Sequence, residues 1–207
     1  MTIAINPILQ TNALGSFVGE SDGLVVGTAY PDPSYRNWLS GGILDATETL
    51  PMWGGIAISE LIPTATPAPQ PRFELGGRIK RATTYSGTAA GSLTGFSVYD
   101  QNYALVNSPQ SPVPSGSNGM LVNFYRLGSN ARVALEIDPA LVSAEGGLIS
   151  QQFSWDFTNQ KIIAFATTAL NVRVLTIQVG NCMTAVYNSG TGFVTWNRSA
   201  SAAVCLL

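Results

Sequence analysis

Two runs of alternating residues meet in the stretch MLVNFYRLGSNARVALEI, residues 120–137. Every second position is apolar in each run, with Met120, Val122 and Phe124 in the first and Val133, Leu135 and Ile137 in the second. A period of two is typical of a β-strand with one face buried. We therefore expect two strands here, separated by a loop of Gly, Ser and Asn.

The same period continues towards the C-terminus. Three further runs share one face each: Phe153, Trp155 and Phe157; Lys161, Ile163 and Phe165; and Arg173, Leu175, Ile177 and Val179. A tight turn is expected at residues 158–160, two strands around residues 188–192 and a final strand near residues 202–206. Strand runs at a spacing of about 8 to 12 residues, with no clear helical period, predict an all-β fold, an antiparallel β-sandwich or barrel that is jelly-roll-like.

The first part of the chain lacks clean alternation and is rich in Gly and Pro. Residues 24–28 give its best short run. We expect residues 1–50 to be an extended arm or long loops and residues 51–207 to be the β core of a single domain. A second proline-rich excursion is expected at residues 108–119, because it is too long for an ordinary connection.

An uncharged, proline-rich segment follows a short apolar strand in the stretch PMWGGIAISELIPTATPAPQPRFELGG, residues 51–77. Pro63, Pro67, Pro69 and Pro71 favour polyproline II, in which nine residues reach roughly 25 to 28 Å. Such an arm could lie against a protein surface or be a solvated linker. Trp38 and Trp53 lie in the irregular part and are candidate anchors for a partner surface, whereas Trp155 and Trp196 lie in strand runs and are expected in the core. The predicted partner interface therefore comprises Trp38, Trp53 and the four prolines.

Charge is scarce in this chain. Charged residues make up 11% of its 207 residues, the net charge is −2 and hydrophobic residues make up 45%, against roughly 25% charged residues in an average globular protein. This composition favours a folded protein that contacts other protein surfaces. It disfavours a nucleic-acid partner, which needs a basic stripe. The one basic cluster, at Arg78, Lys80 and Arg81, is expected to be a solvated strand face.

No apolar run approaches the ~20 residues that span a bilayer, and no export signal is recognised at the start, so we expect a soluble protein without a membrane partner. The two cysteines, Cys182 and Cys205, are 23 positions apart in predicted strands. We expect them to be buried reduced thiols.

The chain contains no histidine. This removes the commonest general base and zinc ligand and every Ser-His-Asp or Cys-His arrangement. Paired carboxylates remain, as in glycosidases, with Glu136, Asp138 and Asp156 as candidates. Asp138 is better interpreted as the start of an Asp-Pro turn. We accordingly assign no catalytic, cofactor-binding or metal-binding residue, and expect a protein that is not an enzyme.

Three stretches resemble a known family: GTAYPDPSYRNWLSGGILDATETLPMWGGIAISELIP (residues 27–63), GFSVYDQNYALVNSPQSPVP (residues 95–114) and QVGNCMTAVYNSGTGFVTWNRSASAAVCLL (residues 178–207). Together they are similar to the head decoration, or cement, proteins of tailed bacteriophages. The resemblance covers the chain from about Gly27 to its end and includes no catalytic motif.

This resemblance implies a β-rich structural protein, made in the host cytoplasm and located on the capsid surface of the virion. It implies binding to the outer face of the capsid lattice, where the protein would bridge neighbouring major capsid protein subunits, without any cofactor. Self-association is also expected, as a trimer in preference to a dimer. The alternative is a receptor-binding or carbohydrate-binding module of a phage tail or fibre.

Overall fold

The computed structural model describes residues 23–30, 38–61, 77–85, 91–99, 106–108, 111–144, 146–147 and 150–207. Within these residues the regular elements are β-strands and one 3₁₀ helix, η3 (Pro139–Ala144). The all-β prediction is therefore confirmed. None of the described residues forms a helix long and apolar enough to cross a bilayer.

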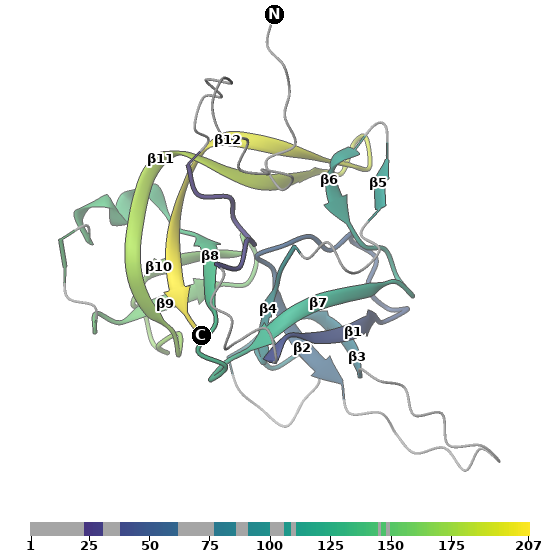
Figure 1. Cartoon of the computed structure of the whole chain (residues 1–207), viewed down its shortest axis with the longest axis horizontal. Coiled ribbons are helices and arrows are strands. Elements are labelled where there is room, and N and C mark those ends of the chain that lie inside the picture. Colours follow the sequence, from purple (N-terminus) through teal and green to yellow (C-terminus); the bar gives the residue numbers. More distant parts are fainter. Residues whose placement is uncertain are drawn as a thin grey trace, which may run out of the picture.

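Five strands close into a barrel, at the lower right of Figure 1. Their order around the barrel is β1-β3-β2-β4-β7, and β7 pairs back to β1. The strands are β1 (Ser40–Leu44), β2 (Ala57–Leu61), β3 (Arg78–Arg81), β4 (Gly95–Ser97) and β7 (Leu121–Arg126). Four of the pairings are antiparallel, while β1 and β3 run parallel. Of the two predicted architectures, the barrel is thus present, with one parallel pair that the alternation does not reveal.

The barrel interior is filled by bulky apolar side chains from several of its strands. They are almost completely buried: Leu44, Met52, Ile56, Ile58, Ile79, Val122 and Phe124. Burying a side chain of this size stabilises the fold by roughly 1.5–3 kcal/mol. Val122 and Phe124 point into the barrel, which explains why apolar residues alternate along β7.

Strand β1 lies in the part of the chain that was expected to be an arm or loops. Its sequence, SGGIL, contains two glycines, which weaken a strand on propensity alone. A Cβ atom at Gly42 would lie 2.4 Å from the Ile79 Cγ2 atom. Gly42 is needed because β3 packs too closely for a side chain at this position. Since β1 is a strand of the barrel, the β core begins before residue 51.

Three strands form a second sheet in the order β11-β12-β8, with β11 (Arg173–Asn188), β12 (Phe193–Leu206) and β8 (Arg132–Glu136). The hairpin of β11 and β12 arches over the molecule in Figure 1. Each of the two is one long strand, where the sequence predicted shorter separate strands. The register shifts between Gln178 and Cys182, and Gly180 and Asn181 there have positive φ. This irregularity interrupts the regular alternation, so one strand reads as two.

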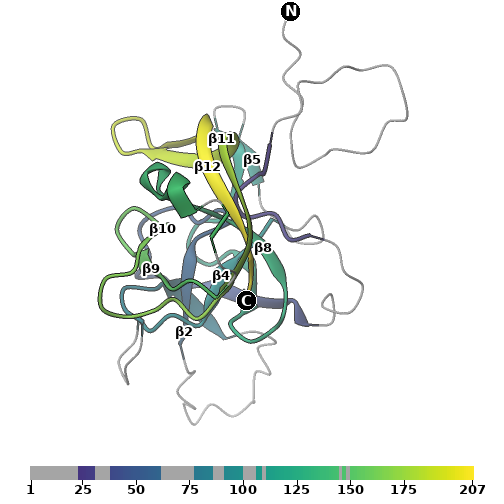
Figure 2. The ribbon, with the colours of Figure 1, turned by 90° about the vertical axis from the view of Figure 1, so that its left-hand side faces the viewer.

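A two-stranded hairpin, β9 (Phe153–Asp156) and β10 (Lys161–Ala164), joins the barrel to the second sheet. Figure 2 shows it on the side of the molecule, near β2 and β4. The Phe96 ring of β4 packs edge-on against Trp155 of β9, with centroids 4.8 Å apart. Both belong to the largest apolar core, together with Val133, Leu135, Ile162 and Cys205. The outer wall of the barrel and the second sheet therefore share one core.

The remaining strands are β5 (Val106–Ser108) and β6 (Ser111–Ser115), which pair with each other. Part of the excursion expected at residues 108–119 is thus a strand. Proline is tolerated at the edge of a sheet, where no ladder hydrogen bond is lost, so a proline-rich run need not be a loop. The other proline-rich segment, with Pro63, Pro67, Pro69 and Pro71, lies outside the described residues.

Candidate functional site

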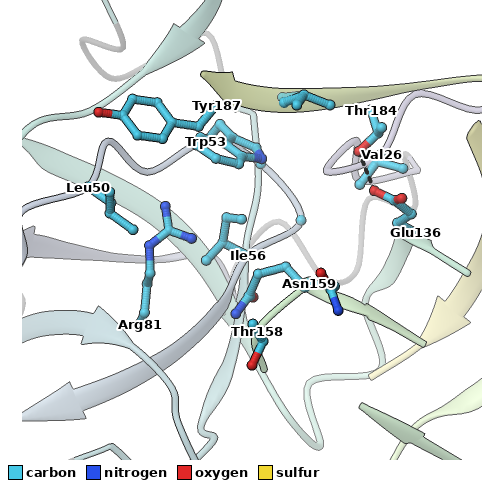
Figure 3. Close-up of a pocket in the computed structure, with 15 residues that line it drawn as sticks. Val26, Leu50, Trp53, Ile56, Arg81, Glu136, Thr158, Asn159, Thr184 and Tyr187 are labelled. Carbon is cyan, nitrogen blue, oxygen red and sulfur yellow. Dashed lines mark hydrogen bonds between the residues drawn. The ribbon is translucent and has the colours of Figure 1, made fainter. Parts of the chain in front are cut away.

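A pocket of about 350 Å³ opens where the barrel, the β9–β10 turn and the β11–β12 hairpin meet. Figure 3 shows its lining side chains. One wall comes from the barrel, with residues 53–56 and Arg81. The opposite side comes from the second sheet, with Glu136 and residues 184–187. Val26, Leu50 and residues 158–160 complete the lining. Its volume falls within the range of ligand sites in proteins.

Glycines bring the pocket's backbone segments together. Gly27 has φ +85° and Gly55 has φ +88°, conformations that favour glycine. A Cβ atom at Gly27 would lie 2.2 Å from the Gly54 carbonyl carbon, and one at Gly55 would lie 2.5 Å from the Val26 Cγ1 atom. The two turns can therefore touch only without side chains at these positions.

Arg81 occupies the barrel side of the pocket. Its guanidinium carbon lies 5.0 Å from the centroid of the Trp53 ring, and its Nε atom lies 3.5 Å from the Glu48 Oε1 atom. Nη2 also donates to the Pro51 carbonyl oxygen, and the Arg81 amide donates to Glu48 Oε2 (3.0 Å). Burial lowers the pKa of Arg81, and the neighbouring Glu48 carboxylate opposes that effect.

The prediction of a solvated basic face at residues 78–81 is therefore wrong for Arg81, whose side chain is only 14% exposed. Arg78, 62% exposed, does face solvent and lies 3.6 Å from Asp45. The strand alternates, so neighbouring basic residues lie on opposite faces. Closure of the barrel brings residues 48–53 beside Arg81.

Glu136 lies on the other side of the pocket, at the end of β8. The Thr184 hydroxyl on β11 donates to its Oε2 atom at 2.6 Å. Burial raises the pKa of Glu136; the Thr184 hydrogen bond and the charge of Lys161 lower it, and the charge of Asp138 raises it further. The Lys161 ammonium group forms an ion pair with Asp138, with Nζ 2.7 Å from Oδ2. Glu136 is thus a partly desolvated carboxylate with a neutral hydrogen-bond donor.

The tight turn predicted at residues 158–160 is present and lines the pocket. Asp156 Oδ1 accepts hydrogen bonds from the amides of Thr158 (2.8 Å) and Asn159 (3.0 Å), and its Oδ2 accepts one from Asn159 Nδ2 (2.7 Å). Gln160 Oε1 accepts a hydrogen bond from the Ala57 amide (2.9 Å), which ties the turn to the barrel. Asp156 therefore holds the turn in place.

The three carboxylates considered for glycosidase chemistry lie around Lys161, and each of them raises the pKa of that lysine. Glu136 alone among them lines the pocket. Asp138 starts η3 by accepting a hydrogen bond from the Ala140 amide (2.9 Å), as predicted, and pairs with Lys161. Among the described residues no cluster of three or more Cys, Asp or Glu side chains could hold a metal ion.

The pocket rim is apolar and open to solvent. Leu50 is 40% exposed and Val186 is 45% exposed, and both line the pocket with Tyr187. The sequence analysis did not single out these three residues, and it interpreted Arg81 as part of a solvated strand face. A signal was available for Val186, an apolar residue between the polar residues Thr184 and Asn188 on one face of β11.

The two predicted tryptophan anchors differ in their surroundings. Trp53 is half-buried between the barrel core and the pocket, with Arg81 over its ring. Trp38 is 63% exposed and is not part of the pocket lining. Of the tryptophans expected in the core, Trp155 is buried and Trp196 is half-buried against Tyr99, with ring centroids 5.8 Å apart. Both cysteines are buried and unpaired, as expected.

The pocket therefore combines an apolar rim, one ion-paired arginine and one desolvated carboxylate. The chain matches no protein-family model, no curated protein and no solved structure.

Proposed function

We propose that the protein is a capsid decoration, or cement, protein of a tailed bacteriophage. It binds the outer face of the capsid lattice, bridges neighbouring major capsid protein subunits and stabilises the head. It acts without catalysis or a cofactor, and it self-associates, as a trimer in preference to a dimer. The proposal joins the resemblance found in the sequence to the chemistry of the pocket rim.

One observation supports a protein partner most directly. Leu50, between β1 and β2, and Val186, on β11, come from distant parts of the chain and flank the same pocket, each at least 40% exposed. Apolar residues gathered around a depression mark protein–protein contact sites more often than isolated exposed residues do. The exposed Trp38 offers a second anchor.

Scarcity of charge supports the same function. Charged residues make up 11% of the chain, and the described ion pairs Asp45–Arg78, Glu48–Arg81, Glu60–Arg126 and Asp138–Lys161 engage several of them. Interface cores are depleted of charged residues because unpaired charges are costly to desolvate. A surface of this kind loses little when a neighbouring subunit covers it.

Retention on purified heads tests this proposal. Purified phage heads that lack this protein are mixed with the native chain or with Val186→Ser, and bound protein is measured after sedimentation. We expect Val186→Ser to weaken retention. Val179→Ser is the matched control, because Val179 lies on the same strand, has a similar exposure of 43% and does not line the pocket. Equal retention of all three proteins would contradict the role of the rim, and absence of native binding to heads would refute the function.

A second candidate function is a receptor-binding or carbohydrate-binding module of a phage tail or fibre. The observation that favours it is the presence of Tyr187, Asn159 and Glu136 around one pocket, since aromatic faces and planar polar groups are suited to sugars. Titration with host polysaccharide distinguishes the two functions. Saturable binding that Tyr187→Ala abolishes would favour this candidate over the capsid function. The absence of binding to any host glycan would rule it out.

A further inference from the structure

We propose that the pocket receives a lysine or arginine side chain of the partner protein, with its aliphatic part against the exposed rim residues Leu50 and Val186 and its cationic group at Glu136. This inference rests on the proposed function only in that the partner is a protein. It specifies the chemistry that the partner must present. It also assigns Glu136 as the residue that recognises the partner.

The charges in the pocket favour a cation. Arg81 and Glu136 are the charged residues that line it. Arg81 already has Glu48 at 3.5 Å, the Pro51 carbonyl oxygen and the Trp53 ring. Its positive charge is therefore compensated from the barrel side, and Glu136 is left as the group that sets the sign of the pocket.

Glu136 lacks an equivalent partner of its own. The neighbouring cation, Lys161, is 2.7 Å from Asp138, and the donor to Glu136 is the neutral hydroxyl of Thr184. A partly buried carboxylate without a direct ion pair is costly, because burial disfavours its charged form; the charge of Lys161 offsets only part of this cost for Glu136. An ammonium or guanidinium group entering the pocket would supply charge-assisted hydrogen bonds to that carboxylate.

The apolar rim of the pocket suits a long amphipathic side chain. Leu50 and Val186 are 40% and 45% exposed and line the same pocket as Glu136, and Figure 3 shows Leu50 on the Arg81 side with Glu136 on the opposite side. Lysine and arginine place an aliphatic stem along apolar surface and keep the charge at its end. An acidic side chain would repel Glu136, and a neutral sugar would leave its charge without a counter-ion.

An NMR titration tests the inference without any capsid. The ¹⁵N-labelled full chain is titrated at neutral pH with N-acetyl-lysine N-methylamide, with the arginine equivalent and with the norleucine equivalent, which has the same stem without the charge. We expect amide shifts at residues 54–56 and 184–186 with both basic probes. The norleucine probe is expected to bind at least about tenfold more weakly, a difference of about 1.4 kcal/mol.

Glu136→Gln is expected to remove the preference for the basic probes. This variant should fold normally, because the amide keeps an acceptor for Thr184 and avoids burying a charge; urea unfolding checks this. Glu60→Gln is the matched control, since Glu60 pairs with Arg126 (2.7 Å) and does not line the pocket. It should retain the preference.

The affinity for the basic probes should also fall as the pH decreases through the raised pKa of Glu136, because the protonated carboxyl attracts a cation less. Lys161 and Asp138 titrate outside this range, since each of their pKa values is shifted away from neutrality by the other.

Three outcomes would overturn the inference: equal binding of the norleucine probe, an unchanged preference in Glu136→Gln, or neutral monosaccharides shifting the same amides while the basic probes do not. Its failure is distinguishable from failure of the proposed function. If the chain binds the basic probes but does not bind heads, the capsid function alone is refuted. Retention on heads with no response to the probes would refute the inference alone.

Discussion

Phe96 joins the barrel to the β9–β10 hairpin, and its replacement by alanine tests whether the two unfold together. The side chain is fully buried and its ring packs on Trp155 with an interplanar angle of 68°. A phenylalanine buries about 150–250 Å². Removing about 150 Å² at ~25 cal/mol per Å² costs about 4 kcal/mol, within the ~3–5 kcal/mol measured for such substitutions. We therefore expect Phe96→Ala to lower the free energy of unfolding by about 4 kcal/mol.

Urea unfolding followed by tryptophan fluorescence measures the effect. Phe165→Ala is the matched control, because Phe165 directly follows β10 and is 48% exposed; its cost should be below about 1 kcal/mol. A single shared transition is expected, since Phe96 and Trp155 lie in one core. Equal costs for the two variants, or a separate transition for Trp155 alone, would refute the conclusion that the barrel and the second sheet share a core.

Three further predictions concern the ion pair, the thiols and the glycine turn. The Lys161 hydrogen bond lowers the pKa of Asp138 below its ordinary 3.8. The ionised Asp138 side chain therefore stabilises the fold above about pH 4, and this stabilisation is lost as the pH falls through the pKa that Asp138 has in the folded protein. Asp138→Asn should accordingly reduce the loss of stability between about pH 5 and about pH 2 in urea titrations. The two cysteines are buried and burial raises the pKa of both thiols, so a thiol reagent at pH ~8 should label neither in the native protein and both in urea; labelling before unfolding would contradict this burial. Gly27→Ala should lower the free energy of unfolding by at least about 2 kcal/mol, because a left-handed φ is combined with a clash against Gly54. The control Gly128→Ala has a similar φ of +84° but open space around the added Cβ atom, so it should lower that free energy less. Equal losses for the two variants would mean that the contact with Gly54 is unimportant.

The sequence predicts strands well where one face of the strand meets a single core. In β8, the apolar residues Val133 and Leu135 alternate and point into the largest core, as expected. In β7, Tyr125 is buried in that same core while Val122 and Phe124 fill the barrel. The alternation of β7 therefore predicts a strand, and it does not reveal that both faces are covered.

Other features of the fold depend on contacts that composition does not encode. Strand β1 was assigned to loops because of its glycines, and the crowding that requires Gly42 comes from Ile79, which is distant in sequence. The bulge near Gly180 hides the continuity of β11. Strand order is equally hidden, since it depends on which apolar faces meet after closure.

The same division holds for the candidate site. The role of Asp138 was predicted from sequence because its carboxylate accepts from an amide two positions along the chain. Asp156 also serves amides within three positions, but the sequence analysis offered it only as a candidate catalytic carboxylate. The contact of Glu136 with Thr184 joins residues 48 positions apart. Arg81 reaches the Pro51 carbonyl oxygen 30 positions away. The first contact requires the second sheet to form, and the second requires the barrel to close.

The distribution of carboxylates gives Glu136 its significance. Four of the six described acidic residues form ion pairs: Asp45, Glu48, Glu60 and Asp138. Asp156 is held by two backbone amides and an asparagine amide. Glu136 is partly buried with the Thr184 hydroxyl as its donor, and glutamine would accept that hydrogen bond without the cost of desolvating a charge. The charge of Lys161 gives the Glu136 carboxylate some electrostatic support within the fold, and a cationic partner would add a direct ion pair.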